Sequence, residues 1–499
     1  MEFFDRNSHM AWKNKKISSF VRITVVVVIA QLLFSIYYSG RQPLWLDEIY
    51  QVSFSGCDNS LMDTLMKTET SPPLFRLIAN IWYNNMPFGE AYLLLLSEIF
   101  VSIGILFAGI IGHTFFCDEI AIVMEVLYGF STVVIEKCSF EFRSYALLNM
   151  LTWMLMYVLL KRRDNNDSGY RYFVEQGVLM TLLAYTHYFG VILCVVIGII
   201  DFILWIKNNF KHYYIVTYVM LGVMYVPWII RFTSLAKTIQ PNQSWMMDPT
   251  VNNAYILFSS LVGGYSVIIF LFLVGFAYLL KTRKYNYLSK KLLFLPIIVI
   301  EVFVIMWIYG KYISPNATLW VLRYFTILIP AIIITVGYSL LLIKEYFVTT
   351  RNHMVVKCIV IACLFLYILQ TACAISLYVS EVADGIDVAN HNDFRAAADW
   401  IYEDKNKYKE EDTALAMTNV GEAEGVIDGW HEYYITRKGS REGMNVVTTN
   451  DADKLLKYKY VYYCVTPCAD DRLSEIINLN YTLVYYNEDY SIYFYVRNY

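Results

Sequence analysis

The stretch VRITVVVVIAQLLFSIYYSGRQPLWLDEIY, residues 21–50, decides how this chain is interpreted. Its first half belongs to an apolar segment at about 18–39. Such a segment can cross a bilayer as a helix, because ~20 helical residues cover a hydrocarbon core of ~30 Å. Directly after it come Trp45-Leu46-Asp47-Glu48, which place two carboxylates beside the predicted membrane surface. The stretch therefore predicts a membrane protein with chemistry at the bilayer surface.

The composition supports a membrane location for most of the chain. Of the 499 residues, 57% are hydrophobic and only 17% are charged, whereas about 25% of the residues of a soluble domain are charged. The formal net charge of -3 provides no bulk positive field for nucleic acid. About eleven spans are expected, at roughly 18–39, 90–112, 117–135, 145–160, 173–187, 188–206, 213–231, 253–280, 291–311, 322–343 and 355–379.

The positions of the basic residues predict the orientation of these spans. Lys and Arg gather in alternate loops, and such loops are usually cytoplasmic. The clusters are Lys13 to Arg22, Lys161-Arg162-Arg163, Lys207 with Lys211, Lys281 to Lys291, and Lys344 with Arg351. We therefore expect a multi-pass protein of the cell membrane with a cytoplasmic N-terminus. The membrane domain would comprise residues 1–380, and an extracytoplasmic domain would comprise residues 381–499.

Four outer loops are expected, and the first, at about 41–88, is too long for a simple connection. Apolar residues recur in it at helical spacing, which predicts two short amphipathic helices in the membrane interface: Leu61, Leu65 and Met66 in one, and Leu74, Leu77, Ile78 and Ile81 in the other. Ser71 is expected to cap the second helix, with Pro72 at its first position. The other outer loops are expected at 136–143, 231–251 and 312–320.

The tail is predicted to be a small α/β domain. Three helices are expected: one that follows a cap at Asn392, one over Gly421 to Arg437, and one near Leu473 to Asn478. Expected strands are Thr413 to Thr418, Tyr460 to Thr466, Tyr481 to Tyr486 and Ser491 to Val496. Cys464 and Cys468 flank a Thr466-Pro467 turn, and geometry decides whether they form a disulfide.

Asp47 and Glu48 are the first candidates for chemistry. An ionised carboxylate in a loop at the membrane surface can act as general base toward an acceptor hydroxyl. Glu48 would then orient the acceptor, although the two roles could be exchanged. The alternative is a pair of solvated acids that cap the next turn. The pair could also hold a divalent metal ion; no other spacing indicates a metal site, and no cofactor is certain.

Four short elements resemble those of the polytopic C-type glycosyltransferases, especially bacterial relatives of the protein O-mannosyltransferases and of the lipid A aminoarabinose transferase. The elements are Trp45-Leu46-Asp47-Glu48, Ser71-Pro72-Pro73-Leu74-Phe75, Glu141-Phe142-Arg143-Ser144-Tyr145 and Arg323-Tyr324, in the family's order. Asp393-Phe394-Arg395-Ala396-Ala397 also looks like the start of the external domain in such proteins. Serine stands at position 71 where the family usually has histidine, and His187 is a candidate substitute.

The resemblance implies a polytopic α-helical membrane protein of the C-type glycosyltransferase fold with a small C-terminal α/β domain. It also implies a hexosyl- or pentosyltransferase that takes its sugar from a polyprenyl-phosphate carrier. Arg143 and Arg323 would bind the donor phosphate, because guanidinium forms two parallel hydrogen bonds with it. His187 and Tyr324 would join them, while Glu141, Tyr145, Ser71 and Pro72 would position the acceptor or the loops.

The expected reaction is an inverting transfer to a hydroxyl of a glycan, glycolipid or protein. The sequence does not decide which sugar or which acceptor is used. Two rival interpretations remain, a transporter or lipid flippase for cell-envelope precursors and a noncatalytic sensor. The intramembrane acids Glu98, Glu125 and Glu301 favour a transporter. Most other candidates lie in outer loops or at outer span ends, which favours the enzyme.

Overall fold

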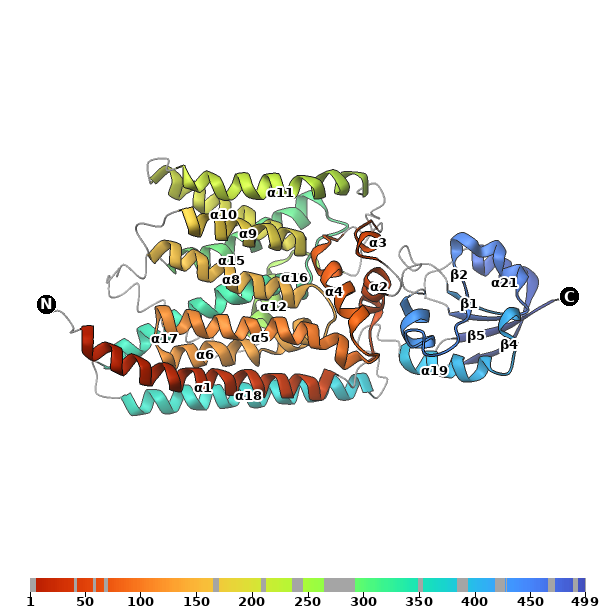
Figure 1. Cartoon of the computed structure of the whole chain (residues 1–499), viewed down its shortest axis with the longest axis horizontal. Helices are drawn as coiled ribbons and strands as arrows, with labels where there is room; N and C mark the ends of the chain where they lie inside the picture. The colour runs from red at the N-terminus through yellow and green to blue at the C-terminus, as the bar shows by residue number, and fades with distance from the viewer. Residues whose placement is uncertain are drawn as a thin grey trace. The chain divides into compact units, whose positions relative to one another are not determined.

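The computed structural model forms two compact units. Figure 1 labels the helices and strands. One unit comprises Met1–Tyr37, Thr70–Phe75 and Ser97–Ser376, and the other comprises Tyr38–Glu69, Arg76–Leu96 and Leu377–Tyr499. We call them the helical unit and the tail unit. The structure describes residues 6–39, 43–56, 60–66, 71–164, 170–207, 212–235, 246–263, 292–348, 353–383, 394–417, 427, 429–464, 472–487 and 492–498.

The helical unit consists of packed helices. The described helices that lie mainly in it are α1 (Arg6–Ser39), α5 (Glu90–Phe115), α6 (Asp118–Gly129), α7 (Thr132–Val134), α8 (Tyr145–Asp164), α9 (Tyr170–Thr186), α10 (Tyr188–Lys207), α11 (Tyr213–Leu235), α12 (Val251–Leu261), α15 (Phe294–Ile308), α16 (Leu322–Phe325), α17 (Ile329–Val348) and α18 (His353–Ala383). Helix α9 packs against α8, α10 and α11, and α17 packs against α6, α8 and α15.

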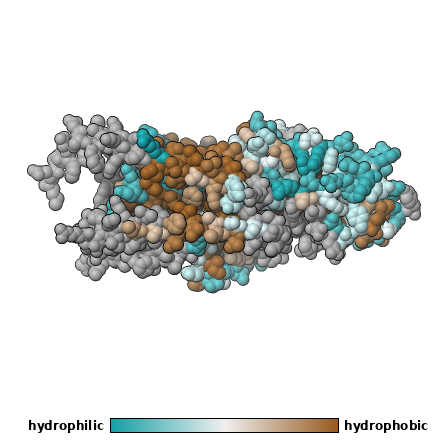
Figure 2. Space-filling view, turned by 90° about the horizontal axis from the view of Figure 1, so that it is seen from below, coloured by the Kyte–Doolittle hydropathy of each residue, from teal (hydrophilic) through white to brown (hydrophobic). Residues whose placement is uncertain are grey.

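Six described segments are long and apolar enough to cross a membrane. They are Phe20–Tyr38, Glu90–Phe115, Tyr188–Lys207, Tyr213–Ser234, Phe294–Ile313 and Leu322–Leu342. Hydrophobic residues dominate part of the visible surface over the helices in Figure 2. The protein is therefore a multi-pass membrane protein, and the number of about eleven spans stays a prediction. The segment predicted at 117–135 is interrupted after Gly129, and the one predicted at 253–280 is described only to residue 263.

Two of the three intramembrane acids noted in the sequence are fully buried and bonded. The Gln31 side-chain amide donates to Glu98 Oε2 at 3.2 Å, and Thr24 Oγ1 donates to Glu125 Oε1 at 2.7 Å. A Cβ on Gly109 would lie 1.9 Å from Glu125 Oε1, so glycine makes room for this carboxylate. Glu301 is only half-buried.

A fourth buried acid, Asp201 on α10, was not singled out in the sequence. It pairs with Arg162 of α8, whose Nη1 lies 2.9 Å from Asp201 Oδ2. Gln176 Nε2 and the Tyr218 hydroxyl donate to the same oxygen at 2.9 and 2.8 Å. Arg162 is only 5% exposed, so this member of the predicted inner basic cluster is a buried structural cation.

Three short helices follow the first span. They are α2 (Leu46–Ser55), α3 (Leu61–Met66) and α4 (Leu74–Asn85). The two predicted amphipathic helices correspond to α3 and α4. Two expectations were wrong: Asp47 and Glu48 lie in the first turn of a helix and not in a loop, and α4 begins at Leu74, so Ser71 is not its cap and Pro72 is not its first residue.

The tail contains a five-stranded sheet in the order β2-β1-β3-β5-β4. The strands are β1 (Thr413–Met417), β2 (Asn445–Val447), β3 (Tyr460–Cys464), β4 (Tyr481–Asn487) and β5 (Ile492–Arg497). Strand β1 is parallel to β2 and β3, whereas β5 is antiparallel to β3 and β4. All four predicted strands are present, and β2 was not predicted.

Helices pack beside the sheet and complete the tail core. One face buries alternate residues such as Ala414, Ala416 and Val461 against α21 (Arg472–Asn480) and a 3₁₀ segment, η7 (Thr449–Lys457). On α19 (Phe394–Lys405), the Trp400 ring packs against Tyr462 and Tyr485. Cys464 is a buried free thiol, while Cys468 and the predicted cap Asn392 lie outside the described residues.

Candidate functional site

Asp47 and Glu48 occupy different environments in α2. Asp47 is half-buried, whereas Glu48 is only 2% exposed. The backbone N–H of Trp45 donates to Glu48 Oε2 at 3.0 Å, which closes the first turn of the helix. Glu48 thus closes the first turn, as the capping alternative expects, but it is buried and not solvated. The role of Asp47 as general base stays a prediction.

Three ring side chains from distant segments meet in the helical unit. Tyr145 begins α8, His187 lies between α9 and α10, and Tyr324 lies in α16. The Tyr145 and Tyr324 ring centroids are 5.7 and 5.2 Å from that of His187, and they are 6.2 Å from each other. Phe189 packs on Tyr324 at 5.4 Å. We call Tyr145, His187, Phe189 and Tyr324 the ring cluster.

Local backbone geometry explains how His187 enters the ring cluster. The chain leaves α9 at Thr186 and begins α10 at Tyr188. The backbone N–H of Phe189 donates to His187 Nδ1 at 3.2 Å, which fixes the ring over the start of α10. A Cβ on Gly190 would lie 2.2 Å from the Leu183 carbonyl oxygen, so the sharp turn requires glycine there.

Two cations act on the ring cluster. The charges of Arg143 and Arg323 both act on the His187 ring and on the Tyr145 hydroxyl. Both arginines are half-buried, and the Arg323 guanidinium carbon lies 5.8 Å from the Tyr324 ring centroid. Four residues predicted for the donor site therefore lie in one neighbourhood of the helical unit. Two guanidinium groups beside aromatic rings can bind a phosphate group.

The remaining predicted site residues, Glu141, Ser71 and Pro72, also lie in the helical unit. The Glu141 carboxylate lies 3.3 Å from Lys137 Nζ, and its backbone carbonyl accepts from Ser97 Oγ at 2.9 Å. These contacts hold the segment that carries Arg143. Pro72 is buried and Ser71 is half-buried in the same unit. Phe75, which follows them, packs edge-to-face on Phe142 with ring centroids 5.7 Å apart.

Two segments that precede Arg323, both predicted to lie in outer loops, are bonded to each other. Thr318 Oγ1 donates to the Met247 carbonyl at 2.7 Å, and Trp307 Nε1 donates to the Pro249 carbonyl at 2.7 Å. Trp320 is buried and donates to the Met306 carbonyl at 3.0 Å. These contacts involve described residues of the loops expected at 231–251 and 312–320. Residues 236–245 of the first of these loops lie outside the described residues.

A metal site is not evident in the described part of the chain. No group of three or more His, Cys, Asp or Glu side chains there could hold an ion. Glu48 already accepts a backbone hydrogen bond, which leaves Asp47 as the more accessible carboxylate of the pair. A divalent ion on Asp47 and Glu48 stays a prediction, and no step below depends on it.

Comparison with solved structures identifies the fold. No family model and no curated protein sequence matches the chain. ArnT from Cupriavidus metallidurans in the apo state superposes with a TM-score of 0.56 at 14% identity, over 97% of this chain and 98% of that chain. The chain has the C-type glycosyltransferase fold.

Two further solved structures match the chain. ArnT bound to undecaprenyl phosphate gives a TM-score of 0.54 at 14% identity, covering 96% of this chain and 98% of that chain. The archaeal oligosaccharyltransferase AglB from Archaeoglobus fulgidus, in complex with an inhibitory peptide and a dolichol-phosphate, gives 0.49 at 12% identity, covering 94% and 74%. At 14% identity, the similarity to the two ArnT structures establishes the fold alone and leaves the substrates open.

Proposed function

We propose that this protein is a membrane glycosyltransferase that moves a sugar from a polyprenyl-phosphate carrier to an acceptor hydroxyl on the extracytoplasmic face. The observation that carries the proposal is the convergence of Arg143 and Arg323 on the ring cluster. The C-type fold supports it. So does the similarity to an ArnT structure that contains undecaprenyl phosphate, a lipid phosphate of the proposed class.

In this proposal the two arginines hold the carrier phosphate. Charge-assisted bonds from guanidinium groups offset the negative charge that develops on the phosphate as the sugar leaves. Because a phosphate leaves as an anion, it needs a cationic clamp more than a general acid. Tyr324 and His187 would border this phosphate, and Tyr145 with Glu141 would position the neighbouring segments or the acceptor.

Asp47 is the proposed general base. Its carboxylate would take the proton of the acceptor hydroxyl while that oxygen attacks the anomeric carbon. The bond between the anomeric carbon and the phosphate oxygen breaks in the same displacement, and polyprenyl phosphate leaves with the electron pair. A single displacement inverts the anomeric configuration and forms no covalent sugar–enzyme intermediate.

The clamp can be tested with purified protein and a panel of polyprenyl-phosphate sugars. Arg143→Lys and Arg323→Lys keep the charge but lose the planar fork, so donor affinity should fall roughly tenfold to a hundredfold if one or two charge-assisted bonds are lost. Arg171→Lys is the matched control, because Arg171 is 81% exposed and pairs along its own helix with Glu175.

The same assay separates the enzyme from a transporter. A transporter or lipid flippase would move the carrier without breaking the sugar–phosphate bond, so none of the donors would release its sugar. Unchanged donor affinity in both lysine variants would remove Arg143 and Arg323 from the proposed site.

A further inference from the structure

One tyrosine of the C-terminal α/β domain bonds near both ends of the region between α1 and α5. Tyr434 lies in a π-helical turn, His431–Ile435, and is only 2% exposed. Its hydroxyl accepts from the backbone N–H of Leu44 at 2.7 Å and donates to Glu90 Oε1 at 3.0 Å. All of these residues belong to the tail unit. One hydroxyl thus joins the chain before α2 to the first residue of α5.

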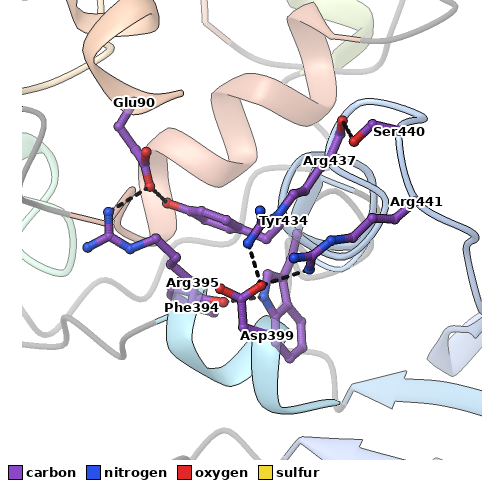
Figure 3. Close-up of polar contacts among 9 residues, drawn as sticks. Glu90, Phe394, Arg395, Asp399, Tyr434, Arg437, Ser440 and Arg441 are labelled. Atoms are coloured by element: carbon purple, nitrogen blue, oxygen red, sulfur yellow. Dashed lines mark hydrogen bonds and ion pairs between the residues drawn. The ribbon is translucent and has the colours of Figure 1, made fainter. Parts of the chain in front are cut away.

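Arg395 completes this contact. Its Nη1 lies 3.2 Å from Glu90 Oε1, the same oxygen that accepts from Tyr434. Figure 3 shows Glu90 between the Tyr434 hydroxyl and the Arg395 guanidinium. Nearby, Asp399 accepts from Arg437 at 2.7 Å and from Arg441 at 2.8 Å, which ties α19 to the segment after Tyr434.

The bond to Leu44 acts at the entrance to the helix that carries Asp47. Leu44 is only 1% exposed and precedes Trp45, whose carbonyl accepts from the N–H groups of Glu48 and Ile49. The first N–H groups of a helix lack partners within it, so contacts with other groups help to fix its entry. The Leu44 bond is such a contact, directly before the cap residue Trp45. Asp47 lies within that turn.

A second contact holds the side of α2. Gly429 lies so close to it that a Cβ would be 2.3 Å from the Ile49 carbonyl oxygen and 3.1 Å from Ser53 Cβ. The Tyr83 hydroxyl on α4 donates to Glu432 Oε1 at 2.8 Å, and Lys438 Nζ donates to the Met86 carbonyl at 2.7 Å. The segment 429–438 therefore contacts both α2 and the end of α4.

We propose that Tyr434, fixed by Glu90 and Arg395, is a positioning residue for Asp47. The C-terminal α/β domain, which carries Tyr434, would then act in the transfer reaction by fixing the orientation of α2. It would do so through hydrogen bonds at the start of that helix and not through contact with substrate. This inference rests on the proposed function for the part that concerns catalysis. The restraint on α2 is a separate claim that can be measured without any activity.

The test uses the full-length protein in lipid nanodiscs and the variant Tyr434→Phe, which keeps the ring and removes the hydroxyl. Amide hydrogen exchange in residues 44–52 should become roughly threefold to tenfold faster, as expected for one lost hydrogen bond at a buried site. Tyr462→Phe is the matched control. It removes another buried tail hydroxyl, which donates to Asp404 Oδ2 at 2.6 Å within the α/β core, so exchange in residues 44–52 should stay unchanged.

The kinetic expectation is a lower kcat with an unchanged KM for the donor. In an Asp47→Asn background, Tyr434→Phe should cause no further loss of rate, because it acts through Asp47. Arg395→Met leaves the Tyr434 hydroxyl in place and should give a smaller increase in exchange, which keeps the test available if Tyr434→Phe fails to fold.

Unchanged exchange in residues 44–52 of Tyr434→Phe would overturn the inference, and so would faster exchange with an unchanged kcat. Failure of the proposed function has a different signature. Either the parent protein would then transfer no sugar, or Asp47→Asn would transfer it at the normal rate, whatever the exchange of α2.

Discussion

Removal of the Asp201 carboxylate should destabilise the helical unit strongly. Asp201 accepts from Arg162, Gln176 and Tyr218. Both members of the Arg162–Asp201 ion pair are almost fully buried. The variant Asp201→Ala leaves the Arg162 guanidinium buried without its counter-charge. Breaking one partner of a buried pair typically lowers the free energy of unfolding by about 3–5 kcal/mol, and we expect a loss in this range.

The neighbouring ion pair provides the scale. Arg171 and Glu175 form an exposed pair on α9, with Arg171 Nε 2.7 Å from Glu175 Oε1, and exposed pairs contribute little to stability. Glu175→Ala is therefore the matched control. Denaturant titration in mixed micelles, followed by tryptophan fluorescence, compares the two variants with the parent protein.

A double variant distinguishes the lost pair from lost packing. Arg162→Met combined with Asp201→Leu replaces both charges by apolar groups, and it should be less destabilised than Asp201→Ala alone. The reasoning is refuted if Asp201→Ala is no less stable than Glu175→Ala, or if the double variant is at least as destabilised as the single one.

Further predictions concern the tail and the topology. Burial, with a smaller effect of the Lys405 charge, lowers the pKa of His431 from 6.5 to about 4, and its Nε2 accepts from the Met444 N–H at 2.8 Å. The folded protein holds the His431 imidazole in its neutral form, so this contribution to tail stability should be complete above pH ~6.5. It should fall by up to roughly 3 kcal/mol as the pH drops toward 4. Thermal melts of the intact protein should show this loss and His431→Gln should reduce it, whereas equal acid sensitivity in both proteins would contradict it. In a cysteine-free background, cysteines at Tyr312 and Glu475 should react with an impermeant thiol reagent on whole cells and a cysteine at Arg171 only after lysis. Protection of Glu475→Cys before lysis would place the tail on the other side of the membrane.

The sequence predicts elements well where one local signal dominates. Continuous apolar runs indicate the helices that became α5, α10 and α11, and runs of aromatic and β-branched residues indicate β3, β4 and β5. Strand β2 was missed because Asn445–Val447 is too short to give a periodic pattern and is fixed by pairing with β1. Helix α2 was taken for a loop because its first turn is closed by the Glu48 carboxylate on Trp45 and its side is held by Gly429.

Contacts between distant residues lie beyond a single sequence. Arg143, His187 and Arg323 were selected individually, and only the fold brings their side chains into one neighbourhood. Asp201 and Tyr434 were not singled out, because their importance comes from partners 39 and 344 positions away. Local periodicity carries no signal for such pairs.

The most direct test of the proposed function is the transfer rate of Asp47→Asn. This substitution preserves shape while removing basicity, so it should lower kcat by roughly a hundredfold to ten-thousandfold without unfolding the protein. Glu48→Gln should lower kcat much less, because an amide oxygen can still accept the hydrogen bond from the Trp45 N–H and close the first turn of α2. Transfer by a well-folded Asp47→Asn protein at near the parent rate would contradict the assignment of Asp47 as general base.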